Sequence, residues 1–331
     1  MEKAVKRIGV LTSGGDAPGM NAAVRAVTRT AISRGVECIG IRRGWNGLIN
    51  GDFIQMDASS VSHIIHKGGT ILYTARSEEF KTAPGREKAL GTCKLLGLDG
   101  IVAVGGDGTF RGALALSRQA AEHGQSLQVV GIPATIDNDI GCSHYTIGFD
   151  TACNTAVECI DKLRDTMQSH ERCSVVEVMG RHAGYLALYV GISVGATAVL
   201  IPERPVDFQR DIVEAIRKAR LAGVTHFMIV VAEGAGSAVD IGKRIHDEIG
   251  IDPRVTVLGH IQRGGSPSSR DRETASRMGY HAVMSLVANK GNRVIATQEG
   301  RVVDIDMEEA LAMTKPFQMD RYDVLEALSL H

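Results

Sequence analysis

Several features that would narrow the function are missing from this 331-residue sequence. Aromatic residues make up only 4% of it, whereas glycine occurs 38 times, which suits the tight turns of an α/β protein better than an aromatic-rich all-β protein. No apolar run reaches the length of about 18 residues that a membrane-spanning helix needs, so no membrane partner is expected. The formal net charge of −1 gives no overall attraction to nucleic acid.

The six cysteines include no C-x-x-C pair, which argues against a zinc knuckle or a disulfide framework. We therefore expect reduced, mostly buried thiols and a cytoplasmic protein. The charged amino terminus leads straight into a strand-like run, so no signal peptide is expected. The first glycine loop matches neither G-x-x-x-x-G-K-[ST] nor G-x-G-x-x-G, which disfavours a Walker-type NTPase and a standard dinucleotide-binding fold.

Short apolar runs alternate with segments of helical periodicity along the whole chain. This alternation predicts an α/β fold with mainly parallel sheets covered by helices, and at least nine strands indicate two lobes. Eight of these predicted strands cover residues 8–11, 38–41, 100–104, 127–133, 173–179, 196–201, 227–232 and 254–261, and another apolar run precedes Thr74. One predicted helix begins at residue 20. The others cover residues 61–67, 86–96, 113–122, 151–169, 208–222 and 271–288.

Glycine loops follow two of the predicted strands. Gly14 and Gly15 precede a predicted helix whose free amides could bind a phosphate, although a ligand-free turn fits the same letters. The second loop, 105–109, combines three glycines with Asp107, which could hold Mg²⁺ against a phosphate. That loop would also fit a nicotinamide-nucleotide kinase, a lipid kinase or a plain turn.

Charged residues follow the other predicted strands. Two carboxylates stand two residues apart in Thr135-Ile136-Asp137-Asn138-Asp139, although Asp-Asn-Asp is also ordinary turn composition. The open-sheet rule places strand ends around one crevice, where acids, arginines and glycine loops suit phosphoryl transfer. Each arginine taken alone also fits a solvated surface charge. The residues concerned are Gly15, Arg76, Asp107, Asp137, Asp139, Arg181, Glu233 and Arg263.

Five motifs together resemble the bacterial ATP-dependent 6-phosphofructokinase family, and they span essentially the whole chain. They are LTSGGDAPGMNAA at 11–23, GGDGT at 105–109, PATIDND at 133–139, MGR at 179–181 and GHIQRGGSP at 259–267. The resemblance implies phosphorylation of fructose 6-phosphate at its 1-hydroxyl, with ATP and Mg²⁺. It also implies a nucleotide-binding lobe of residues 1–149 and 262–312, and a sugar-phosphate-binding lobe of residues 150–261 and 313–331.

The resemblance also assigns roles to individual residues. Asp137 would be the general base, with Thr135 and Asp139 beside it, and Asp107 would bind Mg²⁺. Arg76 and Arg172 would stabilise the transferring phosphoryl group. The nucleotide would be bound by Gly15, Arg76, Ser77, Gly106, Asp107, Gly108 and Thr109.

The sugar phosphate, by the same resemblance, would contact residues from two subunits. Arg172 and Arg254 would reach in from a neighbour, so the resemblance implies a homotetramer. For His260 a satisfied core histidine is the alternative. The other sugar-phosphate residues would be Thr135, Asp137, Asp139, Met179, Gly180, Arg181, Glu233, His260 and Arg263.

Two departures from the family pattern concern donor and regulation. Ala134 stands where ATP-using members usually have glycine. Pyrophosphate-using relatives carry lysine at that position and aspartate in place of Gly108. ATP is therefore favoured as the donor, with pyrophosphate as the alternative. A non-catalytic sugar-phosphate sensor is a further alternative, which an intact base disfavours. In the effector site Arg25, Arg29 and Arg164 remain, and weakened regulation by ADP and phosphoenolpyruvate is expected. Charge is missing at Ala58, His63, Thr197, Ala222, Val224 and Thr225.

Overall fold

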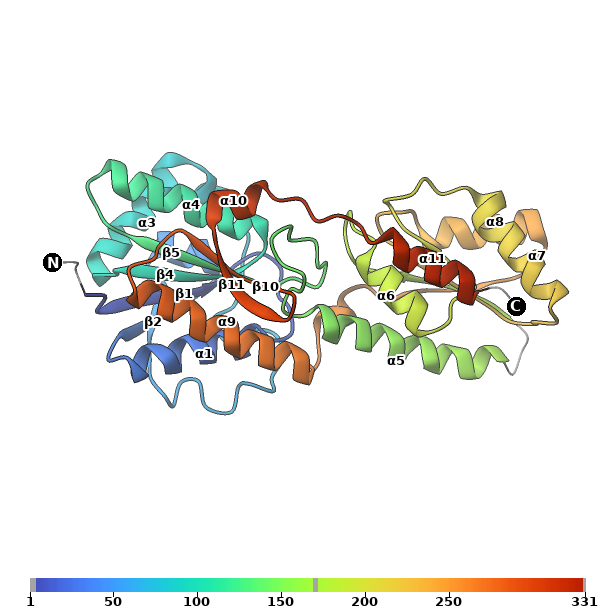
Figure 1. Ribbon diagram of the computed structural model, residues 1–331, viewed down its shortest axis with the longest axis horizontal. Coiled ribbons are helices and arrows are strands. Elements are labelled where there is room, and N and C mark those ends of the chain that lie inside the picture. The colour runs from blue at the N-terminus through green and yellow to red at the C-terminus, as the bar shows by residue number, and fades with distance from the viewer. Residues whose placement is uncertain (1–3, 169–171, 330–331) are drawn as a thin grey trace. The chain divides into compact units, whose positions relative to one another are not determined.

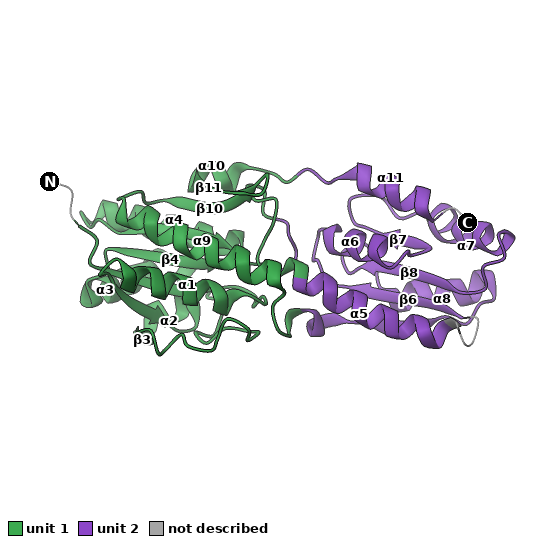
Figure 2. Cartoon of the chain, turned by 60° about the horizontal axis from the view of Figure 1, so that its bottom comes forward, with its two compact units in different colours: residues 1–135, 140–150, 263–315 green, residues 136–139, 151–262, 316–331 purple. Residues whose placement is uncertain are grey.

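The computed structural model describes residues 4–168 and 172–329 of the chain, which divides into two compact units (Figure 2). Unit 1 contains residues 1–135, 140–150 and 263–315, and unit 2 contains residues 136–139, 151–262 and 316–331. Each unit is a mainly parallel sheet covered by helices (Figure 1), so the predicted α/β class is confirmed. The predicted lobe boundaries, which concern ligands, stay a prediction.

The sheet of unit 1 has seven strands in the order β11-β10-β5-β4-β1-β2-β3, with antiparallel strands β3 and β11 at its edges. The strands are β1 (Arg7–Thr12), β2 (Glu37–Ile41), β3 (Phe53–Met56), β4 (Gly100–Gly105), β5 (Gln128–Pro133), β10 (Arg293–Gln298) and β11 (Arg301–Asp306). The helices are α1 (Met20–Ser33), α2 (Gly44–Asn50), η1 (Glu79–Lys81), α3 (Ala83–Leu96), α4 (Asp107–Glu122), α9 (Ser269–Val287) and α10 (Met307–Ala312).

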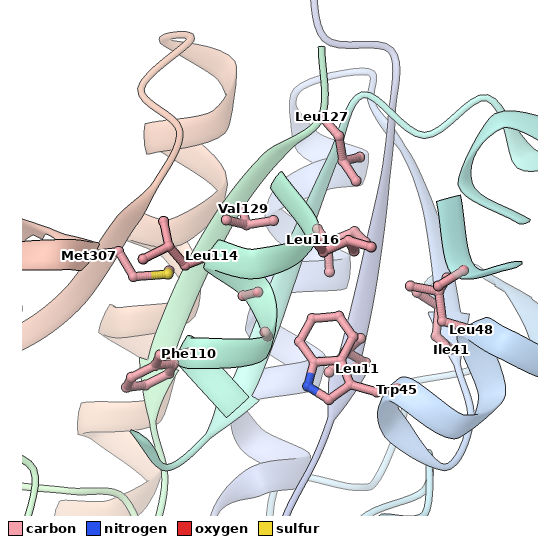
Figure 3. Close-up of a cluster of buried hydrophobic side chains, with 14 of the residues drawn as sticks. Leu11, Ile41, Trp45, Leu48, Phe110, Leu114, Leu116, Leu127, Val129 and Met307 are labelled. Carbon is pink, nitrogen blue, oxygen red and sulfur yellow. The ribbon is translucent and has the colours of Figure 1, made fainter. Parts of the chain in front are cut away.

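Helices cover both faces of this sheet because alternate strand residues point to opposite faces and both sets are apolar. Helices α1 and α9 lie on one face and α3, α4 and α10 on the other (Figure 1). On the second face, Leu114 of α4 lies beside Met307 of α10 (Figure 3). On the first, α9 approaches α1 so closely that a Cβ at Gly279 would lie 2.6 Å from the Cβ of Ala26.

The sheet of unit 2 has four parallel strands in the order β7-β8-β6-β9. Ile229 and Val231 of β8 face Ile212, Ile216 and Ile245 in a second buried cluster. The strands are β6 (Cys173–Val178), β7 (Ala198–Leu200), β8 (Phe227–Ala232) and β9 (Arg254–Val257). The helices are α5 (Phe149–Gln168), α6 (Tyr185–Ser193), η2 (Gln209–Val213), α7 (Glu214–Leu221), α8 (Ala238–Ile249), η3 (Gly259–Arg263) and α11 (Met319–Leu328).

Two local predictions are wrong. Residues 61–67 form turns instead of a helix, because the Asn21 amide binds the carbonyls of Lys67 and Gly68, both at 3.2 Å. The strand predicted for 254–261 ends at Val257, and Gly259 then takes a φ of 53° and starts the 3₁₀ helix η3. The helix predicted for 208–222 is present, as the π-helical turn η2 continued by α7, and it buries Ile212, Ile216 and Ala219 as predicted.

The other predicted strands and helices are present within one to six residues of the predicted ends, with residue 169 outside the described part of the chain. Several further elements were not predicted from the sequence; most of them are short, but α8 was missed although Ala238, Ile241 and Ile245 recur at helical spacing. They are α2, β3, α6, α8, the β10–β11 hairpin, α10 and α11.

Most of the cysteines are buried, as predicted. Cys38, Cys93, Cys142 and Cys173 are buried, and Cys153 and Cys159 are partly buried. Burial raises the pKa of Cys38, Cys93 and Cys173 to about 12, so these side chains remain neutral thiols at neutral pH. Across residues 4–168 and 172–329, we find no helix that combines the length and the apolar character of a membrane span.

Candidate active site

Three neighbouring strands of unit 1 end side by side. Strand β4 lies between β1 and β5, with Thr12 opposite Val104 and Gly105 opposite Pro133. Because the three strands are parallel, both glycine loops and the start of the acidic stretch leave the same edge of the sheet. The structure thus brings together these parts of the predicted site within one unit.

Hydrogen bonds hold the first glycine loop against the second loop and against Thr74. Thr109 Oγ1 donates to the Ser13 carbonyl at 3.2 Å, and Thr74 Oγ1 donates to the Gly14 carbonyl at 2.8 Å. The loops are so close that a Cβ at Gly105 would lie 2.4 Å from both the Ser13 carbonyl oxygen and Thr109 Oγ1. Glycine is therefore required at 105 for packing, before any ligand is considered.

The second loop leads into the N-terminus of helix α4. Gly106 is its N-cap and supplies no side-chain cap, and Asp107 is half-buried in the first turn. Gly108 is exposed, and a Cβ at this position would have nothing within 4 Å, so protein packing does not explain its lack of a side chain. A helix N-terminus attracts an anion, whereas the Asp107 carboxylate repels one. A phosphate with a bound metal cation would suit both groups, because the helix N-terminus attracts the phosphate and the Asp107 carboxylate attracts the cation.

The donor set fits a magnesium ion that arrives with phosphates. Mg²⁺ is usually held by one or two carboxylates together with substrate phosphates and water, and Asp107 offers one such carboxylate. Within the described part of the chain, no cluster of three or more histidine, cysteine or acidic side chains could hold a metal by itself. The residues present therefore suit a metal shared with a nucleotide.

Arg263 lies against the first glycine loop. A Cβ at Gly15 would be 3.5 Å from Arg263 Nη2, so the guanidinium covers this glycine. Arg76 is exposed to solvent on the segment that follows Thr74. The Ser77 hydroxyl donates to Asn46 Oδ1 at 2.8 Å and accepts from the Phe80 amide at 3.2 Å, so both of its bonds support the local fold.

The acidic stretch leaves β5 through a tightly held backbone. The Ala134 amide donates to the Gly105 carbonyl at 3.0 Å, and Thr146 Oγ1 donates to the Thr135 carbonyl at 2.7 Å. Asn138 takes a left-handed φ of 53°, which turns the chain between the two carboxylates. Asp137 is buried, with 5% of its surface exposed, whereas Asp139 is exposed. The two acids thus have different environments.

In unit 2 an arginine reaches the buried carboxylate. Arg181 Nε lies 3.4 Å from Asp137 Oδ2, and the Arg181 amide donates to Glu233 Oε1 at 2.7 Å. The loop is sharply turned, with a φ of 135° at Gly180 and 54° at Arg181. The Arg181 carbonyl is packed against Gly234, where a Cβ would lie 2.1 Å from the Arg181 oxygen. Asp137, Arg181 and Glu233 therefore form one connected group.

Three other predicted sugar-phosphate residues lie elsewhere in unit 2. His260 is exposed on η3, which contradicts the alternative of a core histidine. Arg254, on the edge strand β9, pairs with Asp252 at 3.3 Å. Arg172 is half-buried just before β6, and its carbonyl accepts from the Phe227 amide at 3.2 Å.

The predicted effector arginines are partly used by the fold. Burial and the neighbouring charge of Arg29 lower the pKa of Arg25, so these two cations of α1 repel each other. The Arg164 guanidinium donates to the Val194 carbonyl. Thr197, where a charge was expected, is buried and accepts from the Met228 amide at 3.1 Å.

Several positioning residues had no recognisable sequence signal. Thr74 and Thr146 hold the backbone of the glycine loop and the acidic stretch, but a lone threonine reveals no such partner. Tyr185 is another: burial, then the charges of Glu203 and Asp139, raise its pKa to about 12. A neutral phenol therefore lies within electrostatic range of Asp139.

Known proteins match this chain over most of its length. A family model described as Phosphofructokinase matches residues 7–286. The chain is 50% identical to an ATP-dependent 6-phosphofructokinase from Clostridium botulinum (strain Hall), over 98% of this chain and 100% of that protein. It is also 50% identical to one from Clostridium novyi, with the same coverage.

Solved structures agree on the fold. The phosphofructokinase from Saccharomyces cerevisiae has a TM-score of 0.87 and 35% identity, over 98% of this chain and 46% of that one. This chain thus spans less than half of the yeast chain. A pyrophosphate-dependent phosphofructokinase from Marinobacter aquaeolei has a TM-score of 0.86 over 99% of this chain and 92% of its own, but its 21% identity supports likeness of fold alone.

Proposed function

This chain belongs to the phosphofructokinase family, and from that premise we propose that it transfers the γ-phosphoryl group of ATP to the 1-hydroxyl of fructose 6-phosphate. As a member of that family it is a phosphotransferase, which confirms the predicted resemblance and the prediction of an enzyme. The products are fructose 1,6-bisphosphate and ADP. The relatives at 50% identity, named for the ATP-dependent reaction, support ATP as the donor.

The observation that carries the proposal is the buried carboxylate of Asp137 with Arg181 Nε at 3.4 Å. The arginine favours the ionised carboxylate, which is the form that accepts a proton. Asp137 takes the proton of the 1-hydroxyl as that oxygen bonds to the γ-phosphorus. The bond from this phosphorus to the bridging oxygen then breaks, and ADP leaves with the electron pair. Thr135 and exposed Asp139 flank the base.

The nucleotide phosphates are assigned to the joined glycine loops of unit 1. The amides of Gly15, Gly106 and Gly108 donate to phosphate oxygens beside Thr109, and Asp107 holds Mg²⁺. When bound, Mg²⁺ supplies positive charge to the phosphate oxygens during transfer. Arg76 adds a further cation at this side, and Ser77 adjoins it.

The sugar phosphate is assigned chiefly to unit 2. Its ligands are Met179, Gly180, Arg181, Glu233 and His260, with Arg263 added from η3. Arg172 and Arg254 complete the site of a neighbouring subunit and Arg172 also steadies the phosphoryl group, so the enzyme works as a homotetramer. This assigns the two predicted lobes to nucleotide and sugar phosphate. The buried, neutral thiols suit a cytoplasmic enzyme.

One coupled assay tests the reaction and its donor. The purified chain should form fructose 1,6-bisphosphate with ATP and Mg²⁺ and give no product with pyrophosphate. The buried Ala134, whose amide binds the Gly105 carbonyl, leaves little room for a longer side chain beside the nucleotide loop. Turnover with pyrophosphate but not with ATP would overturn the proposed donor, and a panel of other sugar phosphates tests the acceptor.

We also propose that regulation by ADP and phosphoenolpyruvate is weakened. What supports this is the local use of the candidate groups: Arg164 binds the Val194 carbonyl, Thr197 binds the Met228 amide, and Val224 packs against the apolar cluster of unit 2. A polyanion loses charge-assisted hydrogen bonds when such positions carry no cation. Each effector should therefore change the half-saturating fructose 6-phosphate concentration less than about twofold. A strong sigmoidal shift on titration would refute this.

A further inference from the structure

A buried glutamine supports the loop that carries Arg181. Gln262 has no exposed surface, and its Oε1 accepts a hydrogen bond from the Met179 amide at 2.9 Å. The two residues are 83 positions apart in the chain. Gln262 belongs to η3, between His260 and Arg263, while Met179 directly follows β6. One side chain thus ties together two segments to which the sugar phosphate is assigned.

The loop needs such support because its backbone is strained. Arg181 has a φ of 54°, a left-handed conformation that costs a side-chain-bearing residue roughly 1–2 kcal/mol. Gly180 beside it has a φ of 135° and no room for a side chain, since a Cβ would lie 2.6 Å from the Ala183 oxygen. The Met179 amide is fixed on one side of this turn by Gln262, and the Arg181 amide on the other by Glu233.

The oxygen and the nitrogen of the Gln262 side-chain amide have different hydrogen bonding. The Met179 N–H is a donor, so the atom facing it must be the oxygen, and Nε2 occupies the other end. Nε2 is buried and has no hydrogen-bond partner among the residues that the structure describes. The contact that supports the loop therefore depends on an acceptor at Oε1. A carboxylate in the same place would supply it equally well.

We propose that Gln262 is a positioning residue for the sugar-phosphate half of the reaction, acting through the Met179–Arg181 loop. By holding the Met179 amide it keeps Arg181 turned toward Asp137 and Glu233. The inference rests on the proposed function for its kinetic readout, but not for its structural one. It predicts an effect on fructose 6-phosphate that is larger than any effect on ATP.

Two substitutions separate support of the loop from general stability. Gln262→Met keeps the volume but removes the acceptor, and it should raise KM for fructose 6-phosphate roughly 10- to 100-fold, the worth of an amide left unpaired. Gln262→Glu keeps an acceptor and should stay within about threefold of wild type. KM for ATP should change less than twofold in both.

A buried glutamine of unit 1 provides the matched control. Gln119 donates through Nε2 to the Ala83 carbonyl at 3.0 Å, and it belongs to α4, whereas the Arg181 loop belongs to unit 2. Gln119→Met should lower the melting temperature but leave both KM values unchanged. Equal KM values for Gln262→Met and wild type, a parallel rise in both KM values, or impairment of Gln262→Glu equal to that of Gln262→Met would each overturn the inference.

Hydrogen exchange of the wild-type enzyme tests the contact without relying on activity or on the folding of a variant. The Met179 amide should exchange as slowly as the amides within β6, and in Gln262→Met it should exchange at least tenfold faster. Rapid exchange at Met179 in wild type would overturn the inference even if the enzyme is active. Slow exchange in a chain that fails to phosphorylate fructose 6-phosphate would instead leave the contact standing and refute the proposed function.

Discussion

The two units build their parts of the candidate site from different materials. Unit 1 uses mainly backbone groups. Its glycine loops leave adjacent parallel strands, and the hydroxyls of Thr109 and Thr74 donate to the Ser13 and Gly14 carbonyls. Unit 2 uses charged side chains, with Arg181 between Asp137 and Glu233. The glycine loops of unit 1 need positions without side chains. The Arg181 loop of unit 2 instead needs hydrogen-bond acceptors from residues far away in the sequence. Substitutions in the two units should therefore fail in different ways.

The largest effect is expected in unit 2, at the proposed base. Asp137→Ser should lower turnover by roughly 10²- to 10⁴-fold, the usual worth of a positioned base, because no group then accepts the proton of the 1-hydroxyl. Binding of fructose 6-phosphate, measured by calorimetry, should remain within about threefold, since Arg181 is 47% exposed and water replaces its lost partner. Turnover near the wild-type value would show that another group is the base.

A matched pair of glycines in unit 1 should separate packing from ligand binding. Gly105→Ala places a Cβ 2.4 Å from the Ser13 carbonyl oxygen and from Thr109 Oγ1. It should lower the free energy of unfolding by about 1–3 kcal/mol. Gly108→Ala meets open space and, in a helix, should leave stability unchanged or raise it by up to about 1 kcal/mol. Chemical denaturation measures both.

The same pair sharpens the assignment of the nucleotide. Because Gly108 is exposed and unneeded for packing, its substitution should weaken ATP binding without harming the fold. If Gly108→Ala binds ATP as tightly as wild type does, the loop is a structural turn at that residue. If Gly105→Ala is as stable as wild type, the two loops are not as closely packed as the structure has them.

In unit 2 the next effect concerns Glu233, whose Oε1 binds the Arg181 amide at 2.7 Å. Glu233→Ala leaves that amide without its acceptor and should raise KM for fructose 6-phosphate about tenfold. Glu233→Gln keeps an acceptor and isolates the role of the charge. A small effect of both changes would mean that the loop holds its shape without this contact, whereas impairment of Glu233→Gln alone would be inconsistent with loss of an acceptor.

The same contrast explains what could be predicted from sequence. Gly14 and Gly105 were recognisable because positive φ and close packing restrict the residue type at the position itself. The partners of Asn21 and Gln262 were not recognisable, since each bond joins residues 46 or more positions apart. For that reason the helix predicted at 61–67 was wrong: its segment is held by Asn21 and not by its own periodicity.

Long elements with a regular apolar period, such as α4 and α5, were predicted because burial of one face determines them. The antiparallel β10–β11 pair was missed because β11 is a half-buried edge strand, which gives a weak pattern, and the buried run of β10 inside the sheet is only three residues long. The open-sheet rule and the family resemblance both placed Asp137 and Arg181 at one site, but neither gave their contact. Nothing local to either residue indicates the 3.4 Å contact.

The smallest effect is expected at Tyr73, which compares the strained backbone of the two units directly. Tyr73 and Arg181 have nearly equal left-handed φ values, 55° and 54°, but Tyr73 is 55% exposed and its ring lies 5.2 Å from the Arg43 guanidinium carbon. Tyr73→Gly relieves roughly 1–2 kcal/mol of strain. It also adds unfolded-state entropy worth about 0.5–1 kcal/mol and loses an exposed cation–π contact of similar size.

These terms nearly cancel, so the unfolding free energy of Tyr73→Gly should stay within about 1 kcal/mol of wild type, measured by denaturant titration. Turnover and both KM values should also stay the same, because the Thr12 hydroxyl donates to the backbone carbonyl of residue 73, which glycine keeps, and the bond from Thr74 to the Gly14 carbonyl does not involve residue 73. Strain at Tyr73 would then be a local cost of the turn, unlike the strain at Arg181, which orients a side chain toward Asp137. A loss of ATP affinity in Tyr73→Gly would instead make the ring part of the nucleotide side and remove this distinction between the units.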